Sequence, residues 1–313
     1  MPRFRSSAAR FPSGIARAWI AVVALLLGAC ASTPPRLSYD EVELPDGERV
    51  LEYALYAPPG FAPEETLPLV VFLHGAGDGP DCFDEAGVGQ RLDAAILAGT
   101  LPRAIIVVPR GDLGFWENWV DGSYRYRDWV LRSLIPEIAR RWGTAPCPSD
   151  CHLIGISMGG HGALRFALLE PGAFATVTAV SAPILDTDDA LALVNESWLR
   201  FVIPSRRIWG PGERELIERD DFFLRWTRPE DLGGVDLMLA WADADHAQII
   251  ETNERFVRHL EQNGIPHESF VFPGRHKWQA WTPALERILR ARLSHGPHAS
   301  PQASPPTMPA QTK

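Results

Sequence analysis

The sequence predicts a doubly wound α/β fold built on a mostly parallel sheet, and three observations support this. Several short apolar runs, of which residues 69–73 and 104–108 are the clearest, are typical of strands buried on both faces of a parallel sheet. Segments with helical periodicity separate these runs, which implies right-handed crossovers. The 313 residues are 46% hydrophobic, which is enough for a large core.

The expected strands follow one another in a simple order. The first two, at residues 39–44 and 50–56, are expected to pair antiparallel around the turn Pro45-Asp46-Gly47. The remaining strands are expected at residues 69–73, 104–108, 151–156, 175–180, 235–241 and 268–272. Helices that connect them are expected at residues 92–97, 127–142, 162–169, 248–262 and 282–293.

One stretch breaks this alternation. Residues 186–234 form a connection too long for a plain loop, with Gly210-Pro211-Gly212 and many aromatic residues inside it. We therefore expect a lid or excursion over the strand ends, inserted in a single α/β catalytic domain at residues 39–293. Residues 294–313 are rich in Pro, Ser and Ala and are expected to form a disordered tail.

The N-terminal segment is expected to be a targeting signal rather than part of the fold. Four arginines precede a short apolar stretch at residues 18–27, which ends in Leu27-Gly28-Ala29-Cys30. These residues resemble a bacterial lipobox, which predicts a signal peptide at residues 1–29, diacylglycerol on Cys30 and a linker at residues 30–38. An ordinary signal peptide or an uncleaved anchor is the alternative.

A lipid anchor at Cys30 would place the protein in the bacterial cell envelope. Ala31 follows the cysteine where inner-membrane lipoproteins carry Asp, and by resemblance to Gram-negative lipoproteins this favours the outer membrane. Two or three acyl chains hold a protein at a membrane stably, whereas one does not.

The charge of the chain bears on the class of partner. The net charge of −9 and the lack of a basic cluster in the body of the chain argue against nucleic acid as a partner.

Export permits disulfides among Cys82, Cys147 and Cys151. Cys147 and Cys151 could close a small ring that leaves Cys82 free, and pairing of Cys82 with either is the alternative. None of the three follows the pattern of a catalytic cysteine.

The segment Gly155-Ile156-Ser157-Met158-Gly159-Gly160-His161-Gly162 predicts a nucleophile elbow. It lies between a predicted strand and a predicted helix, which puts Ser157 at the apex of a sharp turn. Gly155 and Gly159 leave the space that such a turn needs. The serine hydroxyl is then exposed above a helix N-terminus, which favours developing negative charge.

A serine nucleophile needs a base and an acid that orients the base. His276 is the predicted base, because it lies in the loop after the last predicted strand. His74 and His161 are rivals by closeness, but we expect them to support the oxyanion loop and the elbow. Asp245 is the predicted acid, at the end of the strand at residues 235–241, and Asp243 is the alternative.

The oxyanion formed during acyl transfer would need two backbone N–H donors. Those of Met158, after the nucleophile, and Ala76, in His74-Gly75-Ala76-Gly77, are predicted to supply them. The glycine-rich turn lacks the following Lys-Ser/Thr of a phosphate-binding loop. Metal-ligand spacings are absent from the sequence, so neither a metal nor a cofactor is expected.

Together these motifs resemble the esterase D, feruloyl esterase and antigen 85 branch of the α/β-hydrolase superfamily. The resemblance rests on the elbow and on segments at the predicted strand ends, namely Leu73-His74-Gly75, Trp116-Glu117-Asn118-Trp119-Val120-Asp121 and Pro273-Gly274-Arg275-His276-Lys277-Trp278. It implies an α/β-hydrolase fold with carboxylic ester hydrolysis or acyl transfer. It also implies that Ser157, Asp245 and His276 form a catalytic triad, in the chain order of that fold.

The sequence therefore predicts a serine carboxylic-ester hydrolase that acts on an exported or extracellular small-molecule or polysaccharide ester. Among eleven tryptophans, Trp119 and Trp278 are the predicted substrate-binding residues, because flat aromatic faces suit sugars and acyl groups. Two alternatives remain: an acyltransferase to a sugar or lipid hydroxyl, and a catalytically silent surface lipoprotein that binds carbohydrate or lipid. The sequence predicts no oligomeric state.

Overall fold

The structure is a computed structural model that describes residues 36–44, 47, 49–197 and 202–294. The predicted signal peptide, the lipidation site Cys30, residues 30–35 of the linker and the tail from residue 295 lie outside the described residues. Within the described ranges, no helix combines the length and the hydropathy needed to cross a membrane.

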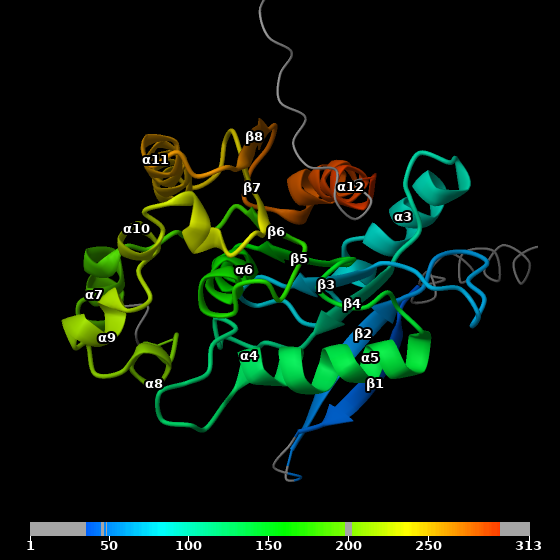
Figure 1. Cartoon of the computed structure of the whole chain (residues 1–313), viewed down its shortest axis with the longest axis horizontal. Helices are drawn as coiled ribbons and strands as arrows, with labels where there is room; N and C mark the ends of the chain where they lie inside the picture. The colour runs from blue at the N-terminus through cyan, green and yellow to red at the C-terminus, as the bar shows by residue number, and fades with distance from the viewer. Residues whose placement is uncertain (1–35, 45–46, 48, 198–201, 295–313) are drawn as a thin grey trace, which may run out of the picture. The chain divides into compact units, whose positions relative to one another are not determined.

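Eight strands form one mixed sheet in the order β1-β2-β4-β3-β5-β6-β7-β8. β1 pairs antiparallel with β2, and β2 pairs antiparallel with β4, whereas every other neighbouring pair is parallel. This confirms the predicted doubly wound, mostly parallel fold (Figure 1). The strands are β1 (Ser38–Glu43), β2 (Val50–Tyr56), β3 (Leu69–Leu73), β4 (Ile105–Pro109), β5 (Cys151–Ile156), β6 (Thr176–Val180), β7 (Asp236–Ala242) and β8 (Glu268–Phe272).

Helices cover both faces of the sheet (Figure 1). Side chains of α3 (Val88–Leu97) and α12 (Trp278–Ser294) pack in the core on one face. Side chains of α5 (Ile135–Trp142), α6 (Met158–Leu169) and α11 (Ala247–Gln262) pack in the core on the other face. The strands between these two cores are almost wholly buried, which is why their sequences are continuous apolar runs.

Several helix boundaries differ from the expected ones. α3, α6 and α12 each begin four residues before the expected start, and Pro283 lies inside α12 rather than in its first turn. The helix expected at residues 127–142 is α4 (Tyr126–Trp129), a π-helical turn η1 (Val130–Leu134) and α5 in succession. The short α2 (Cys82–Glu85), which the sequence analysis did not predict, precedes α3.

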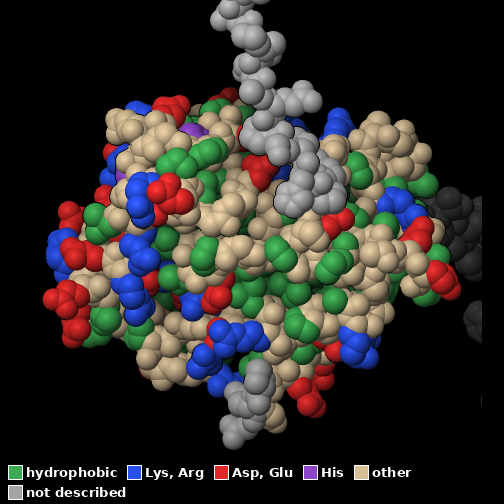
Figure 2. Space-filling model, in the orientation of Figure 1, with side chains coloured by type: hydrophobic (Ala, Val, Ile, Leu, Met, Phe, Trp, Pro, Cys, Tyr) green, Lys and Arg blue, Asp and Glu red, His purple; other side chains and the backbone are tan. Residues whose placement is uncertain are grey.

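The long connection between β6 and β7 is built of short helices that lie beside α6 and α11 (Figure 1). Acidic and basic side chains alternate over this edge of the molecule (Figure 2), and Arg214 there forms an ion pair of 2.6 Å with Asp188. Its aromatic side chains are largely core, since Trp226 is 0% exposed and Trp209 is 7% exposed. A lid function for this segment stays a prediction. Its helices are α7 (Thr187–Asn195), α8 (Ser205–Trp209), α9 (Arg214–Glu218), α10 (Phe222–Arg225) and η3 (Pro229–Leu232).

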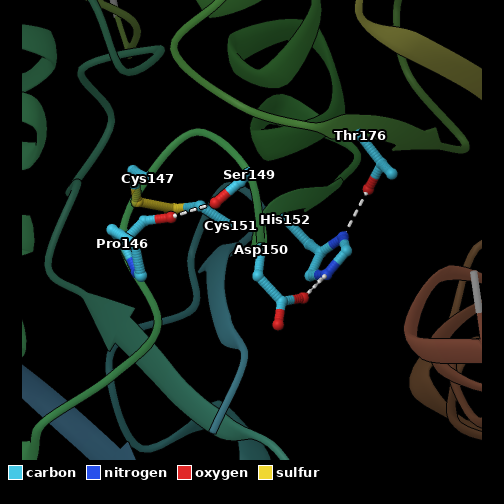
Figure 3. The surroundings of a disulfide bond; sticks show 7 residues. All are labelled: Pro146, Cys147, Ser149, Asp150, Cys151, His152 and Thr176. Atoms are coloured by element: carbon cyan, nitrogen blue, oxygen red, sulfur yellow. Dashed lines mark hydrogen bonds and ion pairs between the residues drawn. A yellow bond between two sulfur atoms is a disulfide. The ribbon is translucent and has the colours of Figure 1, made fainter. Parts of the chain in front are cut away.

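A disulfide joins Cys147 and Cys151 immediately before the strand that leads to Ser157 (Figure 3). This confirms the predicted small ring and leaves Cys82 as a free, buried thiol. Burial raises the pKa of the Cys82 thiol well above its usual value, which keeps it protonated and unreactive. The ring is therefore a covalent brace at the amino end of β5, at the opposite end of the strand from Ser157.

Candidate active site

Ser157 lies on a sharp turn between β5 and α6, with φ 54° and ψ −120°. Residues other than glycine rarely adopt these backbone angles, and here close packing enforces them. A Cβ added to Gly155 would lie 1.9 Å from the carbonyl oxygen of Gly159, and one added to Gly159 would lie 2.0 Å from that of Leu73. The Ser157 N–H also donates to the carbonyl of Val180, at 2.8 Å. Gly155 and Gly159 are therefore required, because any side chain at these positions would clash with the neighbouring backbone.

The structure brings Ser157, His276 and Asp245 together in a single hydrogen-bonded line. The Nε2 atom of His276 lies 2.9 Å from the Oγ atom of Ser157. The Nδ1 atom of the same ring lies 2.7 Å from Oδ1 of Asp245. His276 belongs to the loop between β8 and α12, and Asp245 to the turn between β7 and α11, so three carboxyl ends of parallel strands supply the three groups.

The two candidate acids have different partners. Asp245 contacts His276, whereas Oδ1 of Asp243 accepts the backbone N–H of Gly274 at 2.9 Å. The Asp243 N–H donates in turn to the carbonyl of Phe272, at 2.8 Å. Asp243 therefore holds the loop that carries the histidine, and Asp245 is the carboxylate on the imidazole.

Asp245 is enclosed by donors. Its Oδ2 accepts the Ser181 hydroxyl at 2.6 Å, and its Oδ1 accepts the backbone N–H of His246 at 2.8 Å as well as the bond from His276. Burial alone would raise the pKa of this carboxyl, but the bonds from His276 and Ser181 outweigh burial and lower it below its usual value. Asp245 is thus an anion at neutral pH, suited to orient and stabilise an imidazolium.

His74 fixes the glycine-rich loop after β3. Its Nε2 accepts the backbone N–H of Gly111 at 3.0 Å, so the proton is on Nδ1, which donates to the carbonyl of Gly75 at 2.8 Å. Burial lowers the pKa of His74, which keeps this ring neutral. With the Gly75 carbonyl fixed, the N–H of Ala76 in the same trans peptide is directed the opposite way.

This loop lies against the elbow. The point where a Cβ of Gly75 would stand is 3.4 Å from the Cβ of Ser157. The structure therefore places the Ala76 peptide next to the turn that also carries Met158, the first residue of α6. Their pairing as oxyanion donors stays a prediction.

His161 supports the elbow from inside the protein. Its Nδ1 atom lies 2.9 Å from the carbonyl oxygen of Pro183, and its ring packs edge-on against Phe115 and Phe222. Complete burial lowers the pKa of His161 to about 3, so the ring is neutral. Both rival histidines thus occupy the supporting positions that the sequence analysis expected.

The two predicted substrate tryptophans differ in position. Trp278 is partly exposed and lines an open groove of 780 Å³ together with His276, Lys277 and Glu85. Trp119 is 8% exposed, packs on Tyr124 and is covered by the guanidinium of Arg207, 4.7 Å above its ring. The structure does not bring Trp119 to this groove, because its indole is part of an aromatic core cluster.

Sequence reasoning missed Ser181 and assigned no role to the indole N–H of Trp281. Ser181 directly follows β6, and the carboxyl end of a parallel strand was the signal that could have found it. In the part of the chain that the structure describes, no group of three or more His, Cys, Asp or Glu is placed to hold a metal ion.

Comparison with known protein families agrees with this geometry. A family model described as "Putative esterase" matches residues 47–291 of the chain. The chain belongs to this esterase family. Within this family, the chain is 26% identical over 235 residues to Esterase Rv1288 of Mycobacterium tuberculosis. The aligned region covers 67% of this chain and 49% of that relative. The chain therefore spans about half the length of this curated esterase.

Other relatives match over more of their length. The uncharacterised protein YjcH of Bacillus subtilis is 23% identical over 244 residues, which cover 75% of this esterase-family chain and 90% of that protein.

Solved structures show the same fold. A ferulic acid esterase superposes with a TM-score of 0.68 at 21% identity, covering 82% of this chain and 98% of that one. MPT51 of M. tuberculosis superposes with a TM-score of 0.65 at 19% identity, with the same two shares. The serine hydrolase FphF of Staphylococcus aureus gives 0.65 at 17% identity, covering 83% and 99%. The fold of this esterase-family chain is thus the α/β-hydrolase fold.

Proposed function

We propose that this chain is a serine carboxylic-ester hydrolase that forms an acyl intermediate on Ser157. One observation carries the proposal: the unbroken hydrogen-bonded line from Ser157 through His276 to Asp245, which starts at a strained and partly exposed serine. Membership of an esterase family supports the same chemistry.

In the proposed acylation step, Nε2 of His276 removes the hydroxyl proton while Oγ of Ser157 attacks the ester carbonyl carbon. The carbonyl oxygen becomes an oxyanion that the N–H groups of Ala76 and Met158 stabilise. Asp245 stabilises the imidazolium formed. The carbon–oxygen bond to the alcohol then breaks, and Nε2 returns its proton to the leaving alkoxide, which departs as the alcohol.

Deacylation repeats these roles with water. His276 takes a proton from the water as its oxygen attacks the acyl carbon, and a second oxyanion forms in the same place. Collapse of this intermediate breaks the bond to Oγ of Ser157, and His276 returns the proton to that oxygen. The carboxylic acid leaves, and the serine is ready for another cycle.

Two hollows are candidates to hold parts of the substrate. One is the groove at His276, in which Trp278 offers an aromatic face. The other is a mainly apolar pocket of 460 Å³ whose lining includes Phe115, Leu185 and Ile249, beside the insertion. We propose an exported or extracellular small-molecule or polysaccharide ester as substrate. The ferulic acid esterase among the structural neighbours makes aromatic esters one class worth testing.

The experiment is a p-nitrophenyl ester series from acetate to palmitate, together with methyl ferulate, compared between the native chain and Ser157→Ala. We expect hydrolysis of at least one ester by the native chain and none above background by the variant. A flat response to all substrates by a chain that a fluorophosphonate also fails to label would instead favour the binding protein. Addition of a sugar or lipid alcohol tests the acyltransferase, since new ester product would replace free acid.

We further propose that Cys30 carries the lipid that anchors this enzyme to the cell envelope, with the outer membrane as its location. The support for this is the sequence alone, namely the short apolar stretch that ends in Leu27-Gly28-Ala29-Cys30. Metabolic labelling with a palmitate analogue should mark the native chain and not Cys30→Ser. Equal labelling of the two would exclude lipidation at this residue.

A further inference from the structure

Ser181 makes a second line of hydrogen bonds that meets the first at Asp245. It is fully buried, directly after β6, and its Oγ lies 2.6 Å from Oδ2 of Asp245. Nε1 of Trp281 in α12 lies 3.1 Å from the same Oγ. The Trp281 ring also packs edge-on against the imidazole of His276, with 4.7 Å between ring centroids.

The chemistry of the groups fixes the direction of each bond. An indole N–H can only donate, so Trp281 donates to the Ser181 oxygen. A serine hydroxyl has a single hydrogen, and an ionised carboxylate can only accept, so the Ser181 O–H points to Oδ2 of Asp245. The hydroxyl therefore has one orientation, set by its donor on one side and its acceptor on the other.

The backbone at Ser181 is held in an unfavourable conformation. Its φ is 48°, in the left-handed region that glycine adopts freely and a serine does not. Its N–H donates to the carbonyl of Ala240 at 2.7 Å, which ties this turn to β7. A glycine would fit the backbone better, so the strain points to a use for the side chain.

We propose that Ser181 is a positioning residue for the reaction, and that Trp281 orients its hydroxyl. The Ser181 hydroxyl holds Oδ2 of Asp245, which prevents the carboxylate from turning about its side-chain bonds and keeps Oδ1 on Nδ1 of His276. Both carboxylate oxygens are thus held by donors, Oδ2 by Ser181 and Oδ1 by His276 and the backbone N–H of His246. This inference rests on the proposed serine-hydrolase function and adds two residues to its machinery.

Two variants at one position separate the hydroxyl from the backbone. Ser181→Ala removes the hydroxyl and keeps the strain, whereas Ser181→Gly removes both. Positioning predicts that both lose about 10–100-fold in kcat at unchanged KM, as for groups that orient metal ligands. The downfield proton resonance of the His276–Asp245 hydrogen bond should shift or disappear in both. We expect the Gly variant to melt at a higher temperature than the Ala variant.

A Gly variant with native kcat and a native resonance would overturn the inference, because the side chain would then have no role in the reaction. If both variants fail to fold, Trp281→Phe tests the inference instead. Phenylalanine keeps an aromatic ring against His276 but has no N–H to donate to the Ser181 oxygen. We expect this variant to lose several-fold in kcat with a shifted resonance, and native values for both would contradict the inference. A native chain that a fluorophosphonate does not label would mean that the proposed function itself has failed.

Discussion

Two histidines in this molecule are each held between a hydroxyl and an aspartate, at opposite ends of β5. At the carboxyl end, His276 lies 2.9 Å from the Ser157 hydroxyl and 2.7 Å from Asp245. At the amino end, His152 lies 2.9 Å from the hydroxyl of Thr176 and 3.3 Å from Asp150 (Figure 3). The same three kinds of group are present, yet only the first set has the surroundings of an active site.

The difference lies in the backbone and the exposure. Thr176 is a strand residue, 6% exposed, that pairs in register with His152 on the neighbouring strand. Ser157 lies on a strained turn at a helix N-terminus, next to the glycine-rich loop after β3. Burial lowers the pKa of His152, so this ring serves packing as a neutral group. Ser157, the proposed nucleophile, thus differs from Thr176 in its exposed position on a strained turn, whereas both have an imidazole and a carboxylate nearby.

The largest expected effect tests the two hydroxyls against each other. Ser157→Ala should lower kcat by roughly 10⁴-fold or more, because the acyl intermediate cannot form. Thr176→Val, which removes a hydroxyl of the same kind from the other set, should leave kcat within about twofold. The measurement is ester hydrolysis at pH 8, and equal losses in the two variants would break the distinction between the two ends.

The two aspartates should differ almost as much. Asp245→Asn leaves His276 without an anionic partner and should cost about 10³–10⁴-fold in kcat. Asp150→Asn, at the partly exposed partner of His152, should leave kcat unchanged. Asp243→Asn adds a finer test, since Asn keeps an acceptor for the Gly274 amide and should have a small effect. A large loss in this third variant with none in the first would reverse the two assignments.

The disulfide should affect stability and leave catalysis intact. Cys147→Ser opens the ring closed by Cys147 and Cys151, and loss of so short a loop costs about 2 kcal/mol in the free energy of unfolding. Because the ring lies at the amino end of β5, kcat should not change when the folded variant is assayed. Urea denaturation followed by Trp fluorescence gives the first quantity. A fall in kcat without a fall in stability would mean that the two ends are coupled.

The smallest effect concerns pH and the buried imidazoles. Burial lowers the pKa of His152 and His161 in the folded protein, the latter to about 3, from an ordinary value of 6.5. Below pH 6.5 the unfolded chain therefore binds more protons than the folded protein. As the pH falls, the free energy of unfolding should decrease by up to about 1.4 kcal/mol per pH unit for each histidine. His152→Asn should make this slope shallower between pH 6.5 and pH 5. An unchanged slope would mean that His152 is not held neutral.

The fold could be predicted from sequence because burial on both faces forces strands such as residues 69–73 to be apolar throughout. The start of α6 could not be predicted, because Gly159, Gly160 and Gly162 favour a loop by propensity. Packing overrides propensity there, since a Cβ on Gly162 would lie 2.7 Å from the Cβ of Trp116. Such contacts between distant segments are invisible in a single sequence.

The candidate site shows the same division. His276 and Asp245 could be predicted because each follows a predicted strand in the order that a triad on this fold requires. Ser181 also follows a predicted strand, which marks it as a candidate, but only the fold places it on Asp245. Trp119 and Trp278 have equivalent positions in the sequence pattern. Which of them is core and which lines a groove depends on Tyr124 and Arg207, residues that reach Trp119 only in three dimensions.

Ser157 is the proposed nucleophile of this esterase-family chain. The most direct test of this role is reaction of the native chain with a fluorophosphonate, followed by mass spectrometry of the peptides. We predict one phosphonate on Ser157, no label on the peptide that contains Thr176, and much slower labelling of His276→Ala. Absence of label from Ser157 in a folded chain, or label on another residue, would contradict the account.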